Sequence, residues 1–115
     1  MKSILRGQVH WAQLDPARGS EMAKRRPSVV LSEREINDHR RTVVVLPLTT
    51  SETPAMFPLL LATPSIGAST KVRTEHIRAI DKSRLSGYIT DIGADDLQDI
   101  NRALCKVLAI KHPSV

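Results

Sequence analysis

The feature that most constrains the fold is the run TVVVLPL at residues 42–48. Its β-branched side chains favour an extended strand, and the run is too short for a stable isolated helix. Pro47 lies inside it and has no backbone N–H to give to a sheet, so we expect it at an edge, a bulge or the end of the strand. A sheet should form around this run, with partner strands from elsewhere in the chain.

Several other segments are typical of strands. Residues 8–14 carry Val9, Trp11 and Leu14 among polar residues, an imperfect alternation that predicts a half-buried strand. The segments 28–32, 57–62 and 70–80 predict further strands, and 83–88 is ambiguous. Pro16 and Gly19 mark a loop that continues through a charged stretch to Pro27.

The segment 94–110 has a different periodicity. One helical face carries its large apolar residues, namely Leu97, Ile100, Leu104, Val107 and Leu108. Asp95 and Asp96 occupy the first turn, where the helix dipole favours negative charge, and Lys106 and Lys111 lie near the end. The fold predicted from these patterns is mainly β with helices (α+β): a small twisted sheet or barrel with a C-terminal amphipathic helix, in a single domain over residues 1–115.

Composition and charge narrow the class of protein. The formal net charge of +5 suits a phosphate backbone or another acidic partner, although a domain with an ordinary basic surface would have the same charge. The lone cysteine, Cys105, excludes an internal disulfide framework and is typical of a reducing compartment; we interpret it as a packing residue. The sequence has no signal-peptide pattern and no apolar run of membrane-spanning length, so we expect a cytoplasmic protein without a membrane partner.

The sequence predicts neither a metal site nor a cofactor. The four histidines are dispersed through the chain without the paired spacing of metal ligands, and no phosphate-binding glycine motif occurs. Asp95 and Asp96 resemble an acid pair, but a helix N-terminus explains both.

Two stretches have residue types suited to phosphate chemistry. Arg26 precedes Pro27, which restrains the arginine backbone to extended geometry and so favours a well-placed guanidinium. The strongest strand is followed by the hydroxyl-bearing residues Thr49, Thr50 and Ser51. Taken alone, the first stretch is better explained as a solvated charge run on a loop and the second as ordinary turn residues.

Taken together, three blocks resemble a known family. They read RGQVHWAQLDPARGSEMAKRRPSVVLS, then VVVLPLTTS, then VRTEHIRAIDKSRL. In order and spacing they are similar to the MazF/PemK (Kid) toxins of type II toxin–antitoxin systems, whose members read RG-x-[IV]-W, LDP-x-x-GSEQ, RP, P-[VIL]-T-[ST] and [DE]-Q-[IV]-R-[TS]-[IL]-D. The resemblance covers nearly the whole chain and implies an SH3-like barrel with helices, usually as a homodimer.

The resemblance also implies an activity. Members of this family cut single-stranded RNA at short sequences without a metal ion: the 2′-hydroxyl attacks the adjacent phosphodiester and leaves a cyclic phosphate and a 5′-hydroxyl. The family's principal catalytic residues correspond to Arg26 and Thr49, and a glutamate implicated in some members corresponds to Glu21. By chemistry, Arg26 would stabilise the phosphorane, Thr49 would position the phosphate, and Glu21 would act as base or orienter.

The Kid-like branch relies instead on a later arginine and acidic residue, here Arg73 and Glu75. Its loop histidine corresponds to Ser20, which leaves that set incomplete and favours the arrangement around Arg26. His76 stands where glutamine is usual, so base preference does not transfer. Because the chain has only three aromatic residues and Trp11 is expected in the core, RNA contacts should come from polar residues. The candidates are Ser20, Lys24, Arg25, Asn37, Thr50, Arg73, Glu75 and His76.

Three alternative functions remain beside the ribonuclease, and the resemblance also implies a protein partner. A CcdB-like gyrase-binding toxin shares the fold, but such toxins end in Trp-Gly-Ile, which this chain lacks. A non-catalytic nucleic-acid-binding module would not need Arg26 and Thr49, and a degenerate member would retain only antitoxin binding. The family implies an acidic MazE-like antitoxin whose tail folds onto the basic surface, which the charge of +5 suits.

Overall fold

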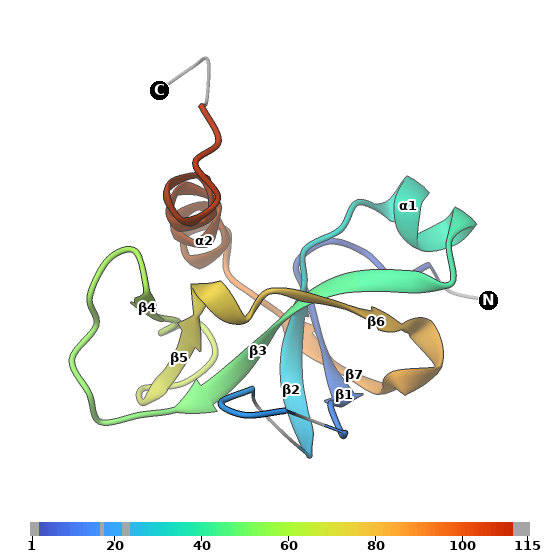
Figure 1. Cartoon of the computed structure of the whole chain (residues 1–115), viewed down its shortest axis with the longest axis horizontal. Helices are drawn as coiled ribbons and strands as arrows, with labels where there is room; N and C mark the ends of the chain where they lie inside the picture. Colours follow the sequence, from blue (N-terminus) through green and yellow to red (C-terminus); the bar gives the residue numbers. More distant parts are fainter. Residues whose placement is uncertain (1–2, 17, 22–23, 112–115) are drawn as a thin grey trace.

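The long strand β3 (Thr42–Thr50) organises the molecule and confirms the predicted strand at 42–48. The computed structural model describes residues 3–16, 18–21 and 24–111. Before β3 come β1 (Gln8–Gln13), β2 (Arg25–Val30) and the short helix α1 (Arg34–His39); after it come β4 (Leu60–Ala62), β5 (Thr70–Arg73), η1 (Thr74–His76), β6 (Arg78–Asp81), η2 (Lys82–Arg84), β7 (Leu85–Asp91) and α2 (Ala94–Val107). The predicted α+β class, mainly β with a C-terminal helix, is confirmed (Figure 1).

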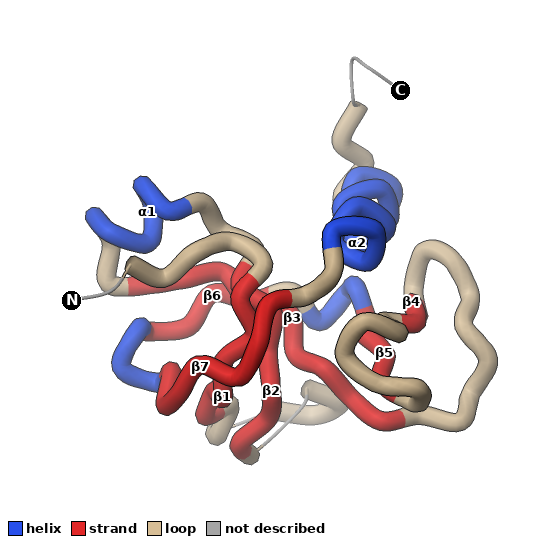
Figure 2. The backbone as a smooth tube through the Cα atoms, turned by 180° about the vertical axis from the view of Figure 1, so that it is seen from behind, coloured by secondary structure: helices blue, strands red, loops and turns tan. Residues whose placement is uncertain are grey.

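The sheet is antiparallel and follows the order β4-β5-β3-β2-β1-β7, with β6 also paired to β3. Figures 1 and 2 show β3 passing between two groups of strands, with β4 and β5 on one side and β1, β2, β6 and β7 on the other. The first part of β3 pairs with β6 and its last three residues pair with β5. The one strand therefore belongs to both ladders and links the two parts of the sheet.

Two apolar clusters lie against the sheet. One contains Val9, Leu46 and Val72 and is closed by Ile100 and Ala103 of α2, both fully buried. The other contains Val30 and Val45 and is closed by Ile80 and Leu85 of the segments around η2. In β3, Leu46 and Leu48 belong to the first cluster while Val43 and Val45 belong to the second, because side chains alternate across a strand. Both faces of the central strand are thus covered.

Helix α2 is shorter than predicted. It ends at Val107 rather than Ile110, because Ala109 adopts the left-handed conformation (φ 55°) that terminates a helix, and Leu108 and Ile110 are exposed. At its other end, Asp96 has a role beyond favouring the helix dipole. Its carboxylate accepts hydrogen bonds from the backbone N–H of Ser65 at 2.9 Å and the Ser65 hydroxyl at 2.5 Å, which fastens the β4–β5 connection to α2.

The predicted strand at 70–80 is interrupted by η1, and Pro47 explains the interruption. The N–H and C=O of Val44 face the β2 side, where they bond Ser32 and Leu31, so alternation turns the backbone groups of Val45 and Pro47 toward β5 and β6. Pro47 has no N–H to offer there. The partner chain leaves the ladder between the pairs Val45↔Arg78 and Leu48↔Val72 and forms η1 in the gap.

Other predicted boundaries also change. The strand expected at 57–62 is reduced to β4, and the ambiguous segment at 83–88 becomes η2 followed by β7. Trp11 was expected in the core, but it is only half-buried, with the guanidinium of Arg25 lying 4.4 Å from its ring centroid. Within residues 3–16, 18–21 and 24–111, no helix is long and apolar enough to cross a lipid bilayer.

The interpretation of Asn37 as an RNA contact is wrong. Asn37 lies on α1, which the sequence did not predict, and it is only 1% exposed. Its amide donates to the carbonyls of Ile4 at 2.9 Å and Ser32 at 3.0 Å and accepts from the Ser32 hydroxyl at 2.5 Å. Asn37 therefore ties the N-terminal segment to the turn after β2 and is unavailable to a ligand.

Candidate active site

The connection between β1 and β2 places two candidate residues, Ser20 and Glu21. Its two ends are held together where the backbone N–H of Lys24 donates to the Asp15 carboxylate at 2.8 Å and the N–H of Leu14 donates to the Lys24 carbonyl at 2.8 Å. At its tip, Arg18 and Glu21 exchange hydrogen bonds: the Arg18 N–H donates to Glu21 Oε1 at 2.6 Å and the Glu21 N–H donates to the Arg18 carbonyl at 3.0 Å. This turn fixes the direction in which the Glu21 carboxylate leaves the backbone.

A second hydrogen bond to Asp15 braces the same connection from across the sheet. Arg84 of η2 donates through Nη1 to the backbone carbonyl of Asp15 at 2.5 Å. Gly19 has a φ of 57°, a left-handed conformation that glycine adopts without cost, and it allows the chain to turn between Arg18 and Ser20. The tip carrying Ser20 and Glu21 is therefore supported from β1 and from η2.

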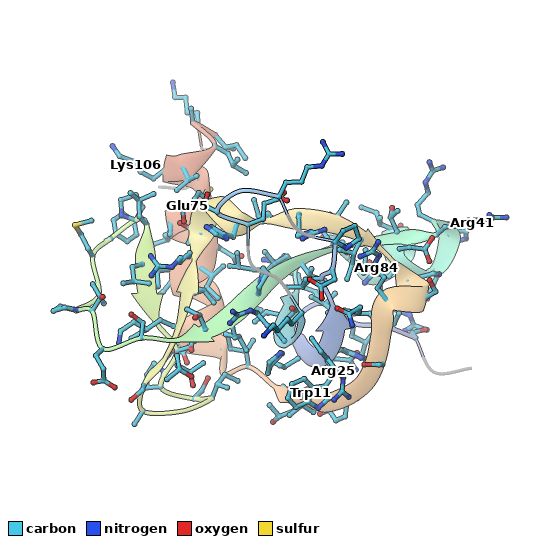
Figure 3. The ribbon with its side chains drawn as sticks, turned by 60° about the horizontal axis from the view of Figure 1, so that its bottom comes forward. Trp11, Arg25, Arg41, Glu75, Arg84 and Lys106 are labelled. Carbon is cyan, nitrogen blue, oxygen red and sulfur yellow. The ribbon has the colours of Figure 1, made fainter. Side chains whose placement is uncertain are left out.

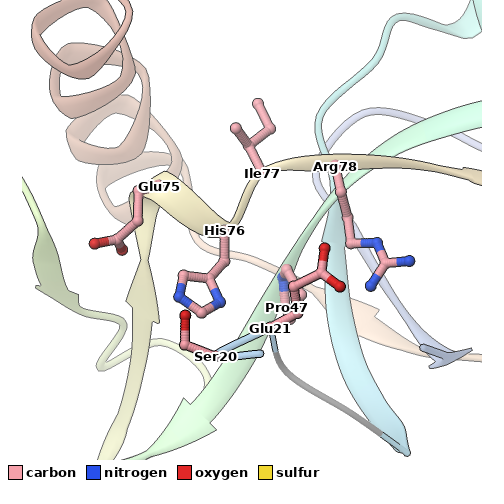
Figure 4. Close-up of a pocket in the computed structure, with 7 residues that line it drawn as sticks. All are labelled: Ser20, Glu21, Pro47, Glu75, His76, Ile77 and Arg78. Atoms are coloured by element: carbon pink, nitrogen blue, oxygen red, sulfur yellow. The ribbon is translucent and has the colours of Figure 1, made fainter. Parts of the chain in front are cut away.

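Glu21 faces η1 across a pocket of about 230 Å³, which we call the η1 pocket (Figure 4). It is lined by Ser20, Glu21, Pro47, Glu75, His76, Ile77 and Arg78. Figure 4 shows the Ser20 hydroxyl beside the His76 ring and the Glu21 carboxylate turned toward the Arg78 guanidinium. The interruption at Pro47 creates this pocket, because residues that leave the ladder in η1 become part of its wall.

A second pocket, of about 310 Å³, lies at the start of β2 and the end of β3. We call it the basic pocket because three consecutive cationic residues contribute to it, beside the hydroxyls at the end of β3 and on β5. It is lined by Lys24, Arg25, Arg26, Pro27, Leu48, Thr49, Thr50, Ile66 and Thr70. Positive charge beside hydroxyl groups is the composition expected of a phosphate site.

Arg26 and Thr49 both line the basic pocket. The last pair of the β2–β3 ladder is Ser28↔Pro47, and Arg26 and Thr49 each lie two residues further toward the same end. Residues two apart on a strand share a face, so both side chains leave the sheet on the face of Pro47, which lines the η1 pocket. Arg26 and Thr49, predicted from two separate blocks of sequence, thus line one pocket, and Glu21 lines the neighbouring pocket together with Pro47.

The remaining predicted contacts divide between the pockets. Ser20, Glu75 and His76 line the η1 pocket, whereas Lys24, Arg25 and Thr50 line the basic pocket. Arg73, which belongs to the Kid-like set, contributes to neither pocket; it lies in β5, paired with Leu60 of β4. Arg25 is held by a hydrogen bond from its Nε to the Ser86 hydroxyl at 3.1 Å and by the Trp11 ring (Figure 3).

Sequence reasoning missed Arg78, which lines the η1 pocket opposite Glu21. The clue in the sequence was the position of Arg78 in the third family-like block, five residues after Arg73. Only the register of β6 against β3 shows which of the two arginines enters the pocket.

The chemical capacity of the two pockets follows from their residues. Cations and hydroxyls can hold a phosphodiester, and a carboxylate beside them can take a proton. Among the described residues, no three His, Cys, Asp or Glu side chains form a group that could hold a metal ion. The fold and the site together define a small β domain with a polar cleft suited to a polyanion.

Comparison with known proteins identifies the family. Residues 5–108 match the model of the PemK-like, MazF-like toxin of type II toxin–antitoxin systems, so the chain belongs to this family. It is 34% identical over 107 residues to endoribonuclease MazF9 of Mycobacterium tuberculosis, covering 86% of this chain and 91% of the relative. It is 29% identical over 110 residues to endoribonuclease MazF2 of Mycobacterium bovis, covering 91% and 96%.

Solved structures agree with this assignment. The crystal structure of MazF from Deinococcus radiodurans superimposes with a TM-score of 0.84 at 26% identity, over 96% of this chain and all of that one. A mycobacterial endoribonuclease in complex with its cognate antitoxin gives a TM-score of 0.77 at 25% identity, again over 96% and 100%. The family resemblance drawn from the sequence motifs is confirmed.

Proposed function

We propose that this chain is the toxin of a type II toxin–antitoxin system and acts as an endoribonuclease on single-stranded RNA without a metal ion. The observation that carries the proposal is that Arg26 and Thr49 line the basic pocket, while Glu21 lines the η1 pocket beside Pro47, which shares a face of β3 with Thr49. The similarity to proteins named endoribonuclease MazF supports it. The proposed toxin domain spans residues 1–115, of which 1–2, 17, 22–23 and 112–115 lie outside the described residues.

Each of the three residues has a role that fits its chemistry. The Glu21 carboxylate takes the proton of the 2′-hydroxyl as that oxygen attacks the adjacent phosphorus. Arg26 binds the non-bridging oxygens, whose charge grows in the phosphorane, through the planar fork of its guanidinium. Thr49 donates its hydroxyl to the same phosphate and fixes its position. The bond to the 5′-oxygen then breaks, that oxygen takes a proton from solvent, and Glu21 returns its proton to solvent, leaving a 2′,3′-cyclic phosphate and a 5′-hydroxyl.

The other lining residues would bind the rest of the RNA. Ser20, Glu75 and His76 offer hydrogen-bond donors and acceptors in the η1 pocket, where a base edge could be read. Lys24, Arg25 and Thr50 extend the basic pocket along the path of the phosphate backbone. Arg73 lies outside both pockets, so we assign it to a flanking nucleotide rather than to the reacting phosphate.

A MazE-like antitoxin is the proposed protein partner. Related MazF proteins from Deinococcus radiodurans were solved as MazE–MazF complexes, and the net charge of +5 suits an acidic segment. We place this activity in the cytoplasm, where messenger RNA is accessible.

The proposal is tested by incubating the purified protein with a mixed single-stranded RNA in EDTA and mapping the cut sites. We expect cleavage at a short recurrent sequence, reduced on the order of 100-fold or more in Arg26→Ala. Arg102→Ala is the matched control, because this arginine is exposed on α2 and its salt bridge among the described residues is to Asp99 of the same helix. RNA binding without cleavage by the folded protein would favour a non-catalytic module. If the folded protein neither bound nor cleaved the RNA, the nuclease proposal would be overturned.

A further inference from the structure

Arg78 carries a buried, unsatisfied hydrogen-bond donor. Its Nη1 is inaccessible to solvent and finds no acceptor within hydrogen-bond distance among the described residues. Buried polar groups in native proteins nearly always have partners, and leaving a charged donor without one is costly. The backbone of Arg78 is held in the β6–β3 ladder opposite Val45, which fixes the point from which its side chain leaves the sheet.

The nearby carboxylates do not neutralise this guanidinium. The salt bridges among the described residues are Arg34–Asp38 and Arg102–Asp99, both on helices away from the η1 pocket. Glu21 and Glu75 line the same pocket as Arg78, yet neither comes within 4.0 Å of it as an ion-pair partner. Figure 4 shows the Glu21 carboxylate turned toward the Arg78 guanidinium at the pocket.

We infer that Arg78 is a second phosphate-binding arginine of the active site and donates to an oxygen of the RNA backbone when substrate occupies the η1 pocket. This inference rests on the proposed ribonuclease function. Val45, Pro47 and Thr49 alternate on one face of β3, so Arg78, opposite Val45, lies on the face from which Thr49 and Arg26 also project. The phosphate would thus meet arginines from two different strands, β2 and β6.

In this arrangement two guanidiniums, those of Arg26 and Arg78, bind the phosphate. The cation of Arg78 is partly withdrawn from water, where its attraction for an anion is screened less than that of an exposed arginine. The bound phosphate would offset the charge of a guanidinium that has no salt bridge among the described residues. A neutral or shorter side chain at this position would therefore weaken substrate binding while sparing the fold.

The experiment compares the wild-type protein with Arg78→Gln, Arg78→Lys and the control Arg102→Gln. Binding is measured with a fluorescent RNA carrying a single 2′-deoxyribose at the cleaved position, at several salt concentrations. We expect Arg78→Gln to weaken binding at least 10-fold and to flatten the slope of log Kd against log salt by about 0.7, the value for one phosphate contact in a single strand. Arg78→Lys should restore the salt slope but not the full affinity, because lysine keeps the charge and loses the planar fork.

A second comparison locates the contact. Replacing the reacting phosphate by an uncharged methylphosphonate should weaken binding to the wild-type protein much more than binding to Arg78→Gln. Thermal unfolding should show Arg78→Gln as stable as wild type or more stable, since the variant removes a buried group without a partner. Equal losses on the methylphosphonate for both proteins, or an unchanged salt slope in Arg78→Gln, would overturn the role of Arg78. If wild type neither binds nor cuts RNA, the proposed function fails instead.

Discussion

At the scale of single residues, the structural roles of Asn37 and His10 depend on how deeply their polar side chains are buried. Asn37 bonds the backbone of Ile4 and Ser32 from a buried position on α1. The Ser32 hydroxyl in turn accepts from the Val44 N–H at 2.9 Å. One amide therefore connects the N-terminal segment, the end of β2 and the start of β3.

Replacing Asn37 should affect stability and leave catalysis intact. We expect Asn37→Ala to lower the free energy of unfolding by about 2–3 kcal/mol, because it leaves buried partners of the amide unsatisfied. RNA cleavage per folded molecule should remain at the wild-type rate. Urea unfolding and a cleavage assay measure the two quantities, with the exposed helix neighbour Asp38→Ala as control. A selective loss of RNA cleavage by folded Asn37→Ala would restore the original interpretation of Asn37 as an RNA contact.

His10 should make the fold sensitive to mild acid. Burial lowers the pKa of His10 below its ordinary value of 6.5, so the folded chain takes up this proton less readily than the unfolded chain. The stabilising contribution is therefore present above pH 6.5 and is lost as the pH falls below it. Urea midpoints between pH 7.5 and 5 should fall more steeply for wild type than for His10→Gln. Parallel pH profiles would show that His10 is not responsible.

At the scale of elements, much of the sheet could be predicted and the details around Pro47 could not. The β-branched run at 42–48 and the helical periodicity after residue 94 depend on local pattern, and both predicted elements are present, although α2 ends at Val107. The break that forms η1 depends on which edge of β3 the proline faces, which only the register determines. Helix α1 was missed because its six residues are too few to show an apolar period.

For the candidate site too, some residues could be predicted from sequence motifs and others only from the strand register. Arg26, Thr49 and Glu21 came from family-like motifs, and the β2–β3 register explains why motifs distant in sequence meet. Arg78 was missed because sequence alone does not tell which of two nearby arginines faces the pocket. Trp11 was misplaced in the core because a tryptophan on a strand usually packs inward, whereas here Arg25 covers its face.

Helix α2 should stabilise the fold through one face only. Ile100 is fully buried in the cluster that contains Leu46, whereas Leu108, just past the end of the helix, is 49% exposed. We expect Ile100→Ala to lower the free energy of unfolding by about 2–4 kcal/mol through lost burial and a residual cavity. Leu108→Ala should change it by less than about 0.5 kcal/mol. Chemical denaturation of both variants checks this, and comparable losses would contradict the assigned packing of α2.

At the scale of the whole molecule, we expect a homodimer. Met56, Phe57 and Leu59 are exposed together on the segment before β4, and Tyr88 and Ile89 are exposed on β7. Exposed apolar side chains on neighbouring positions mark surfaces that bind a partner. Light scattering coupled to size exclusion should give twice the chain mass of 12.7 kDa at micromolar concentration. A single-chain mass at that concentration would contradict the expectation.

In the proposed reaction the RNA supplies its own nucleophile, the 2′-hydroxyl. The most direct measurement uses an RNA oligonucleotide that the protein cuts once, and the same oligonucleotide with a single 2′-deoxyribose on the 5′ side of that bond, both in EDTA. We expect the all-RNA strand to yield a 2′,3′-cyclic phosphate and a 5′-hydroxyl and the substituted strand to remain intact. Cleavage of the substituted strand, or cleavage only after a divalent metal is added, would contradict it.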